Sequence, residues 1–141
     1  MSGIGVDVLS IARMEETLSR SGTRFLDKVF TLKEQAAGKA HPNPTVYFAT
    51  GFAAKEAVFK LFKDDWSRGG SFTEIEVERG VHGEPLVHLT GRMRELAGPG
   101  ACIQISLSWD GDTAFAAALL TRGVSVRFRC HGPKTAMAQA R

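Results

Sequence analysis

The sequence predicts a single α+β domain, in which an antiparallel sheet packs on one long helix and several short helices. The chain has 141 residues, which is enough for one compact hydrophobic core. Apolar and polar residues alternate in segments 3–9, 73–79 and 101–109, as they do in half-exposed strands. Helical patterns dominate residues 11–63 instead, and this segregation of helices from strands is typical of the α+β class.

The first predicted strand, residues 3–9, carries an aspartate, Asp7, on the face opposite its three β-branched side chains. Aspartate is unfavourable inside a strand, so its presence needs a reason. Asp7 either ends the strand and caps the next turn, or it serves a function. Ser10 is expected to cap the following helix over residues 11–21, and Gly22 is expected to end it.

A short helical segment follows before the chain is broken by prolines. Residues 23–30 are expected to form a short helix or turn. Thr31 and Glu34 have the spacing of a capping box, in which each residue bonds the backbone of the other. This spacing predicts a helix of one to two turns that runs to Gly38.

The longest periodic segment is a helix predicted for residues 46–63. It follows the break His41-Pro42-Asn43-Pro44, and Thr45 is expected to cap it. Gly51 lies inside this helix, where a glycine costs about 1 kcal/mol relative to alanine. That cost indicates either close packing at this position or a side chain that has been lost.

The second half of the chain consists mainly of strands and turns. Asp110-Gly111 is its strongest signal for a two-residue hairpin turn. One short helix is expected at residues 91–97, where Gly98-Pro99-Gly100 ends it. The predicted strands of this half span residues 73–79, 85–90, 101–109 and 112–121.

The basic excess of the chain lies in its C-terminal tail. The net charge is +3, but residues 123–141 contain four basic residues and no acidic one. The rest of the chain has 14 basic and 15 acidic residues, so its charge gives no indication of nucleic-acid binding. We expect residues 1–122 to form the domain and the tail to be disordered.

The sequence predicts a cytoplasmic protein without a membrane span. Its longest apolar runs, such as residues 114–120, are too short to cross a bilayer. The first seven residues lack the basic region and apolar stretch of a signal peptide. The two cysteines, Cys102 and Cys130, make no disulfide framework, so reduced thiols are expected, with Cys102 buried in its strand.

Asp7, Glu56 and Lys60 are the strongest candidates for chemistry. Glu56 and Lys60 are four residues apart in the predicted long helix and therefore share a face. They form either an ordinary surface ion pair or a site where the carboxylate holds a divalent cation and the ammonium a phosphate. Asp7 would add a second carboxylate, and two carboxylates with waters and phosphate oxygens commonly bind Mg²⁺.

Covalent catalysis by the protein's own side chains is not indicated. The sequence has no Gly-x-Ser-x-Gly motif, no Walker loop and no dinucleotide fingerprint. If the protein is an enzyme, phosphate chemistry that relies on positioning, a metal ion and a lysine suits its residues.

Three stretches of the chain carry a resemblance to a known family. They are Gly3-Ile4-Gly5-Val6-Asp7, Phe52-Ala53-Ala54-Lys55-Glu56-Ala57-x-x-Lys60 and Ser106-Leu107-Ser108. In order and spacing they resemble the 4′-phosphopantetheinyl transferases, in particular the short holo-acyl-carrier-protein synthase type. Smaller similarities lie at Arg13, Arg24-Phe25, Thr31-x-x-Glu34 and Gly83-x-Pro85, and the resemblance covers about residues 3–121.

The resemblance implies an activity and a set of site residues. The 4′-phosphopantetheine arm of coenzyme A would pass to a serine of an acyl or peptidyl carrier protein, in fatty acid or polyketide biosynthesis, with release of 3′,5′-ADP. Asp7 and Glu56 would hold Mg²⁺, and Lys60 would neutralise the phosphates and assist the leaving group. Ser108 would contact the cofactor.

The resemblance also implies two kinds of partner. Arg13, Arg24 and Lys28 would dock the acidic recognition helix of the carrier protein, mainly by steering and register. Members of this type are homotrimers with active sites between subunits, so a homotrimer is implied.

The chain departs from the family at three places where members are expected to hold the nucleotide end of coenzyme A. Gly51 replaces an arginine, Trp109 replaces a histidine, and residues 63–69 replace a glycine-threonine-glycine turn. The site is either rebuilt, with Trp109 stacked on adenine and Arg68 or Lys63 supplying charge, or it belongs to an enzyme that is slow or selective for an unusual carrier. The third interpretation is a carrier-binding subunit that has lost coenzyme A binding.

Overall fold

In the described part of the chain, the larger of the two sheets has three antiparallel strands. The computed structural model describes residues 2–62 and 69–123 of the chain. In it, β1 (Gly3–Ser10) pairs with β5 (Thr113–Arg122), and β5 pairs with β4 (Ala101–Asp110). The strand order is therefore β1-β5-β4, with β5, the last strand of the described residues, at the centre.

The remaining elements complete an α+β architecture. β2 (Ile75–Arg79) and β3 (Pro85–Leu89) form a separate two-stranded antiparallel sheet. The antiparallel strands are thus divided between two sheets, and the predicted α+β class is confirmed. The helices in the described part of the chain are α1 (Ile11–Val29), α2 (Leu32–Ala40), α3 (Pro44–Lys60), the 3-10 helix η2 (Phe72–Glu74) and α4 (Gly91–Ala97).

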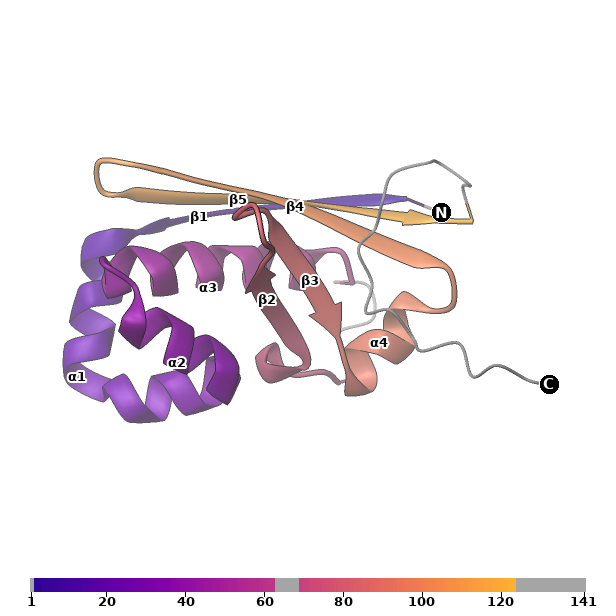
Figure 1. Ribbon diagram of the computed structural model, residues 1–141. Coiled ribbons are helices and arrows are strands. Elements are labelled where there is room, and N and C mark those ends of the chain that lie inside the picture. The colour runs from indigo at the N-terminus through magenta and orange to yellow at the C-terminus, as the bar shows by residue number, and fades with distance from the viewer. Residues whose placement is uncertain (1, 63–68, 124–141) are drawn as a thin grey trace.

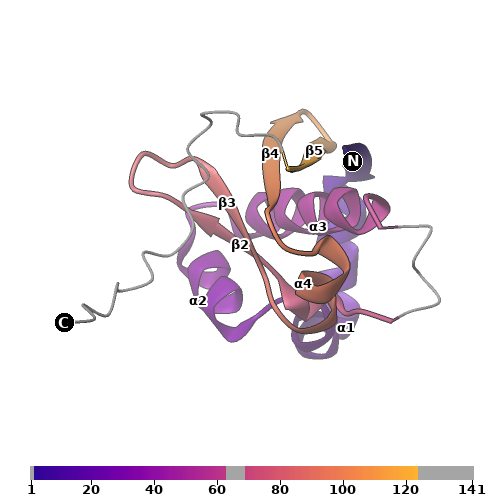
Figure 2. The same cartoon turned by 90° about the vertical axis from the view of Figure 1, so that its right-hand side faces the viewer.

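Helix α3 forms the centre of the molecule. Figures 1 and 2 show it between the larger sheet and the layer of α1 and α2. Small side chains line both sides of the helix–sheet contact, so the two backbones can approach closely. Ala53, Ala54 and Ala57 of α3 are fully buried, and every second residue of β5 from Ala114 to Leu120 is buried against the helix.

Helix α1 is longer than the sequence predicted. Ser10 accepts a hydrogen bond from the Arg13 N–H and is the N-cap, as predicted. The helix does not end at Gly22, because Ser21 absorbs a kink with φ −134° and ψ 25° and the chain continues helically to Val29. The two helical segments predicted over residues 11–30 are therefore one kinked helix.

The long helix begins and ends earlier than predicted. Asn43, and not Thr45, caps α3 by accepting a hydrogen bond from the Val46 N–H. Pro44 takes the first helical position, where the missing N–H costs nothing. The helix ends at Lys60, whereas the prediction extended it to residue 63. Residue 63 itself lies outside the described part of the chain.

Several smaller predictions are settled by the backbone. The capping box of Thr31 and Glu34 is present. The hairpin turn between β4 and β5 is centred one residue later than predicted, because Asp110 pairs with Thr113 and leaves Gly111, at φ +55°, and Asp112 in the turn. The tail of residues 124–141, predicted to be disordered, lies outside the described residues.

Two further predictions can be compared with the structure. Within the described residues, no helix combines the length and apolar character needed to cross a membrane. Cys102 of β4 is half-buried and disulfide-bonded, so the expectation of a fully buried, reduced thiol is wrong.

Gly5 sets the distance between β1 and α3. A Cβ atom built on Gly5 would lie 2.0 Å from the carbonyl oxygen of Ala57 and 3.4 Å from Cβ of Lys60. No side chain fits there unless one backbone moves. The glycine two residues before Asp7 therefore lets β1 lie directly on the last turns of α3.

We predict that Gly5→Ala destabilises the protein. Separating β1 from α3 disrupts a close contact between helix and sheet, and overpacking of this kind costs about 2 kcal/mol or more. Urea unfolding measured by circular dichroism would show the loss.

Gly22→Ala is the matched control. A Cβ on Gly22 has nothing within 4 Å, and the residue lies inside α1. Alanine there should stabilise the helix by up to about 1 kcal/mol. Equal free energies of unfolding for the two variants would contradict the role given to Gly5.

Candidate functional site

The fold brings Asp7, Glu56 and Lys60 to one place. Lys60 Nζ donates to Asp7 Oδ1 at 2.9 Å and to the carbonyl oxygen of Val6 at 2.7 Å. Asp7 lies within β1, opposite Ala116, and its side chain is 17% exposed. The strand continues to Ser10, so the interpretation of Asp7 as a strand-ending cap is wrong.

Glu56 lies one helical turn before Lys60 on α3 and is half-buried. Burial raises the pKa of its carboxyl, the negative charge of Asp7 raises that pKa further, and the Lys60 ammonium lowers it. The Glu56 carboxyl therefore interacts electrostatically with both Asp7 and Lys60. Because Lys60 makes its ion pair with Asp7, the alternative of a simple Glu56–Lys60 surface pair is also wrong.

Two carboxylates facing one space are a suitable donor set for a divalent cation. Asp7 and Glu56 repel each other, as the raised pKa of Glu56 indicates, and a cation between them would relieve that repulsion. The described residues contain no cluster of three or more His, Cys, Asp or Glu side chains able to hold a metal. A cation bound here would thus keep several waters, as Mg²⁺ usually does.

A buried ion pair stands next to this group. Lys55 is fully buried, and its Nζ donates to Glu34 Oε1 at 2.7 Å, to the carbonyl oxygen of Phe72 at 2.9 Å and to that of Ile75. These acceptors take all three ammonium protons. Burial lowers the pKa of Lys55, and the Glu34 carboxylate opposes that shift.

Glu34 completes the link between three elements. Its Oε1 accepts the Thr31 N–H at 2.8 Å, and its Oε2 accepts the Val77 N–H at 3.0 Å. Sequence reasoning identified Glu34 only as a capping residue and gave Lys55 no role. The available signal was a lysine inside helical residues 52–59, which are apolar apart from Lys55 and Glu56.

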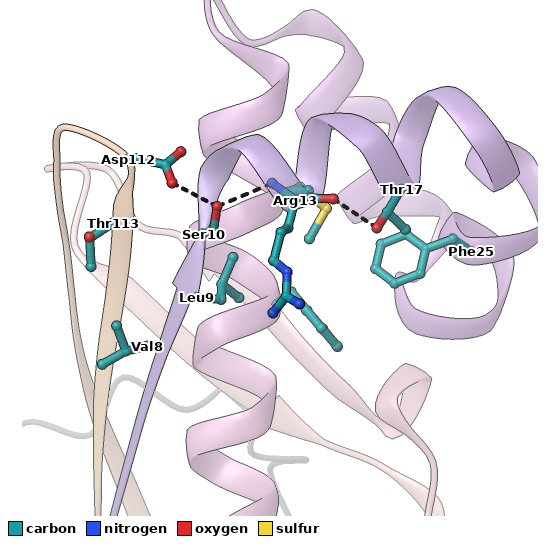
Figure 3. A pocket seen from close by; sticks show the side chains of 10 residues that line it. Val8, Leu9, Ser10, Arg13, Thr17, Phe25, Asp112 and Thr113 are labelled. Carbon is teal, nitrogen blue, oxygen red and sulfur yellow. Dashed lines mark hydrogen bonds between the residues drawn. The ribbon is translucent and has the colours of Figure 1, made fainter.

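A pocket of about 410 Å³ lies beside the carboxylates, between the start of α1, the sheet and α3. Phe52, one turn before Glu56, lines it, and so does Leu9, two residues beyond Asp7 on the same face of β1. Arg13 extends from α1 alongside Leu9 (Figure 3).

The residues predicted to dock a carrier protein all lie on α1. Arg13, in its first turn, lines the pocket. Arg24 and Lys28 are exposed, four residues apart, in the half of the helix beyond the kink at Ser21. The kink thus separates the cation at the pocket from two cations on the outer surface.

The residues predicted to bind the cofactor are more scattered. Lys60 belongs to the carboxylate group. Ser108 points to the sheet face opposite Asp7, because it shares a register row with Phe115 and Val8. Trp109 is 54% exposed near the β4–β5 turn. Arg68 lies outside the described residues.

Gly51 does not face the carboxylate group. A Cβ on Gly51 would lie 3.2 Å from Cε1 of Phe30, in the contact between α3 and the end of α1. Nine residues separate it from Lys60, and at 100° per residue they project from opposite sides of the helix. Close packing, one of the two explanations left open for this glycine, is what the structure shows.

Comparison with known proteins places these residues in a family. The model of the 4′-phosphopantetheinyl transferase superfamily matches residues 3–119. The chain is 40% identical over 123 residues to the holo-[acyl-carrier-protein] synthase of Chlorobium phaeovibrioides, a match that covers 85% of this chain and 97% of the relative.

Solved structures show the same similarity in three dimensions. The complex of the Chronobacterium ammoniagenes synthase with coenzyme A has a TM-score of 0.73 at 29% identity, and the match covers 86% of this chain and 98% of that one. The Helicobacter pylori holo-[acyl-carrier-protein] synthase in complex with coenzyme A also has a TM-score of 0.73, at 26% identity and with 84% and 100% covered.

We predict that Lys55→Met strongly destabilises the protein. The substitution leaves the Glu34 carboxylate buried without its cation, which costs about 3 kcal/mol or more. Adding Glu34→Gln should recover part of the loss, since the amide keeps an acceptor but removes the charge. Urea unfolding of the two single variants and the double variant measures both effects.

Lys39→Met serves as the control for this cycle. Lys39 is exposed in the last turn of α2, and its replacement should change the free energy of unfolding by less than about 0.5 kcal/mol. A similar small change for Lys55→Met would mean that the buried pair contributes little.

Proposed function

Because the chain belongs to the 4′-phosphopantetheinyl transferase superfamily and to its holo-[acyl-carrier-protein] synthase type, we propose that it transfers the 4′-phosphopantetheine arm of coenzyme A to a carrier protein. The acceptor is a serine of an apo acyl or peptidyl carrier, the reaction depends on Mg²⁺, and 3′,5′-ADP is released. The observation that carries the proposal is the convergence of Asp7, Glu56 and Lys60 beside a pocket.

Each member of this group has a role in the transfer. Asp7 and Glu56 would hold Mg²⁺, which when bound would neutralise the pyrophosphate of coenzyme A. The serine oxygen forms a bond to the phosphorus nearer the pantetheine, and the bond from that phosphorus to the oxygen of 3′,5′-ADP breaks. Lys60 offsets the charge on the departing phosphate, and Glu56 orients the water or base that accepts the serine proton.

The electrostatics of Glu56 give the reaction a defined dependence on pH. Its pKa is raised, so the carboxyl takes up a proton at a higher pH than an ordinary glutamate. As the pH falls through that pKa, Glu56 loses the charge needed to hold Mg²⁺. Transfer therefore declines on the acid side as Glu56 takes up its proton.

The basic residues of α1 suit an acidic carrier protein. Arg13 at the pocket, with Arg24 and Lys28 on the outer surface, gives the helix three cations toward a partner. Contacts of this kind accelerate association and fix register, and salt weakens them. The carrier belongs to fatty acid or polyketide biosynthesis, and the protein acts in the cytoplasm.

Incubation with coenzyme A, Mg²⁺ and several apo-carrier proteins, followed by mass spectrometry of the carriers, tests the function. We expect a gain of one phosphopantetheine with the unchanged protein. Glu56→Gln should reduce turnover at least about 100-fold, because losing one charge at a metal site raises the barrier by several kcal/mol. The same substitution should also abolish any increase in melting temperature caused by Mg²⁺.

The outcomes separate the possible functions. No mass gain on any carrier would overturn the transferase proposal. Carrier binding without coenzyme A binding, measured by calorimetry, would instead indicate the carrier-binding subunit. Full activity and an unchanged Mg²⁺ response in Glu56→Gln would remove Glu56 from the metal site.

A second copy of the chain covers the outer face of the larger sheet. This face carries the side chains of β1 and β5 that point away from α3, in the facing pairs Ile4–Leu119, Val6–Ala117 and Val8–Phe115. Ile4 is 75% exposed and Val8 57%, although both are β-branched and apolar. Contiguous apolar surface of this kind marks an interface.

Association also explains where Ser108 lies. It faces this outer surface next to Phe115, whereas Asp7 faces α3. A neighbouring chain on the outer face would bring Ser108 into a boundary between subunits. The family's homotrimer with sites between subunits agrees with this arrangement, and we extend it to this chain.

We predict that Val8→Glu dissociates the assembly and lowers transfer. A charge within the apolar face is incompatible with a dry interface. Size-exclusion chromatography with light scattering should give three chains per particle for the unchanged protein and one for the variant.

Leu32→Glu is the control, because Leu32 is 81% exposed at the start of α2, outside the outer face of the sheet. It should leave the mass of the particle unchanged. A monomeric unchanged protein with full transfer activity would refute the trimer and leave the transferase proposal intact.

A further inference from the structure

The turn between β4 and β5 clamps the start of helix α1 from about 100 residues away. Asp112 supplies three contacts: its Oδ2 accepts the Ser10 hydroxyl at 2.7 Å, its Oδ1 accepts the Ala12 N–H at 2.7 Å, and its carbonyl oxygen accepts the Ile11 N–H at 2.8 Å. The first N–H groups of a helix have no partner within the helix. One residue of a distant hairpin satisfies two of them here.

The clamp extends to Arg13 through Ser10. The Ser10 oxygen that donates to Asp112 also accepts the Arg13 N–H at 3.2 Å. One turn later, the Thr17 hydroxyl donates to the Arg13 carbonyl oxygen at 2.8 Å. The backbone of Arg13 is therefore held on both sides, and all four residues line the same pocket (Figure 3).

The charge of Asp112 suits this position. Hydrogen bonds from the Ser10 hydroxyl and the Ala12 N–H hold the pKa of Asp112 below its usual value, so the side chain is ionised at neutral pH. The first turn of α1 contains no acidic residue of its own. Asp112 thus provides the negative charge that favours the N-terminal end of a helix.

We infer that Asp112 is a positioning residue for the binding of the acyl carrier protein: it fixes the first turn of α1 and thereby holds Arg13 at the pocket. The inference rests on the proposed function, in which Arg13 contacts the carrier. Asp112 does not touch the carrier or coenzyme A in this role. Its removal should weaken carrier binding and leave the chemical step and coenzyme A binding almost unchanged.

Steady-state kinetics and calorimetry with the full chain and an apo-carrier test this role. Asp112→Ala should raise KM and Kd for the carrier about tenfold, as expected when a helix loses an N-terminal cap. We expect kcat and KM for coenzyme A to stay within about twofold of the unchanged protein, since Asp7, Glu56 and Lys60 are untouched. Asp112→Asn keeps an acceptor for the Ala12 N–H, so its effect on the carrier should be smaller.

Asp110→Asn is the matched control, because Asp110 is exposed in the same hairpin and the substitution changes charge by the same amount. It should leave every constant unchanged. In an Arg13→Ala background, Asp112→Ala should add no further loss of carrier affinity, because the residue acts through Arg13. A merely structural role would instead lower kcat and coenzyme A binding together with the melting temperature.

The results distinguish this inference from the proposed function. Carrier binding that does not respond to Asp112→Ala, or that responds equally with and without Arg13, overturns the inference while transfer activity stands. Failure of the unchanged protein to bind or modify any carrier overturns both. A tenfold loss confined to the carrier, and absent in the Arg13→Ala background, supports the inference.

Discussion

The structure depends on a lysine buried at its centre. The Lys55 ammonium is enclosed by α2, α3 and the start of β2, and it persists there because Glu34 and two carbonyl oxygens accept its protons. An unpaired charge at this depth would be very costly, so the buried pair favours the arrangement in which these three elements enclose it. The next residue, Glu56, turns 100° around the helix and faces the site. The buried pair thus determines where the Glu56 carboxylate points.

The larger sheet has two faces to which we assign different roles, the inner one in the proposed site and the outer one in the proposed association of chains. Its inner face carries small residues, alanines on β5 and Gly5 on β1, so the sheet lies close to α3. Asp7 therefore lies within hydrogen-bond distance of Lys60. Its outer face is apolar and open in a single chain. Register separates the faces strictly, because neighbouring residues of a strand point in opposite directions. Asp7 and Ser108 therefore cannot contribute to one site within one chain.

Sequence alone determined the class of the fold and identified Asp7, Glu56 and Lys60 as the candidate site residues. Alternation revealed the strands because one face of each is buried, and the spacing of Thr31 and Glu34 revealed a cap because both bonds of a capping box are local. Asp7, Glu56 and Lys60 could be selected because a carboxylate in a strand and a carboxylate beside a lysine are unusual combinations, which the family resemblance connected. Signals of this kind lie within a few residues of each other.

Tertiary structure decided which residues become partners. Lys60 bonds Asp7 and not the nearby Glu56, because β1 crosses the helix at the close approach permitted by Gly5. The contact of Asp112 with the start of α1 joins residues about 100 positions apart, and no local sequence pattern predicts it. Hydrogen bonds and ion pairs act over a few ångströms in space, whereas sequence patterns record only neighbours along the chain. Only the packing of the sheet on α3 brings residues that are far apart along the chain close together in space.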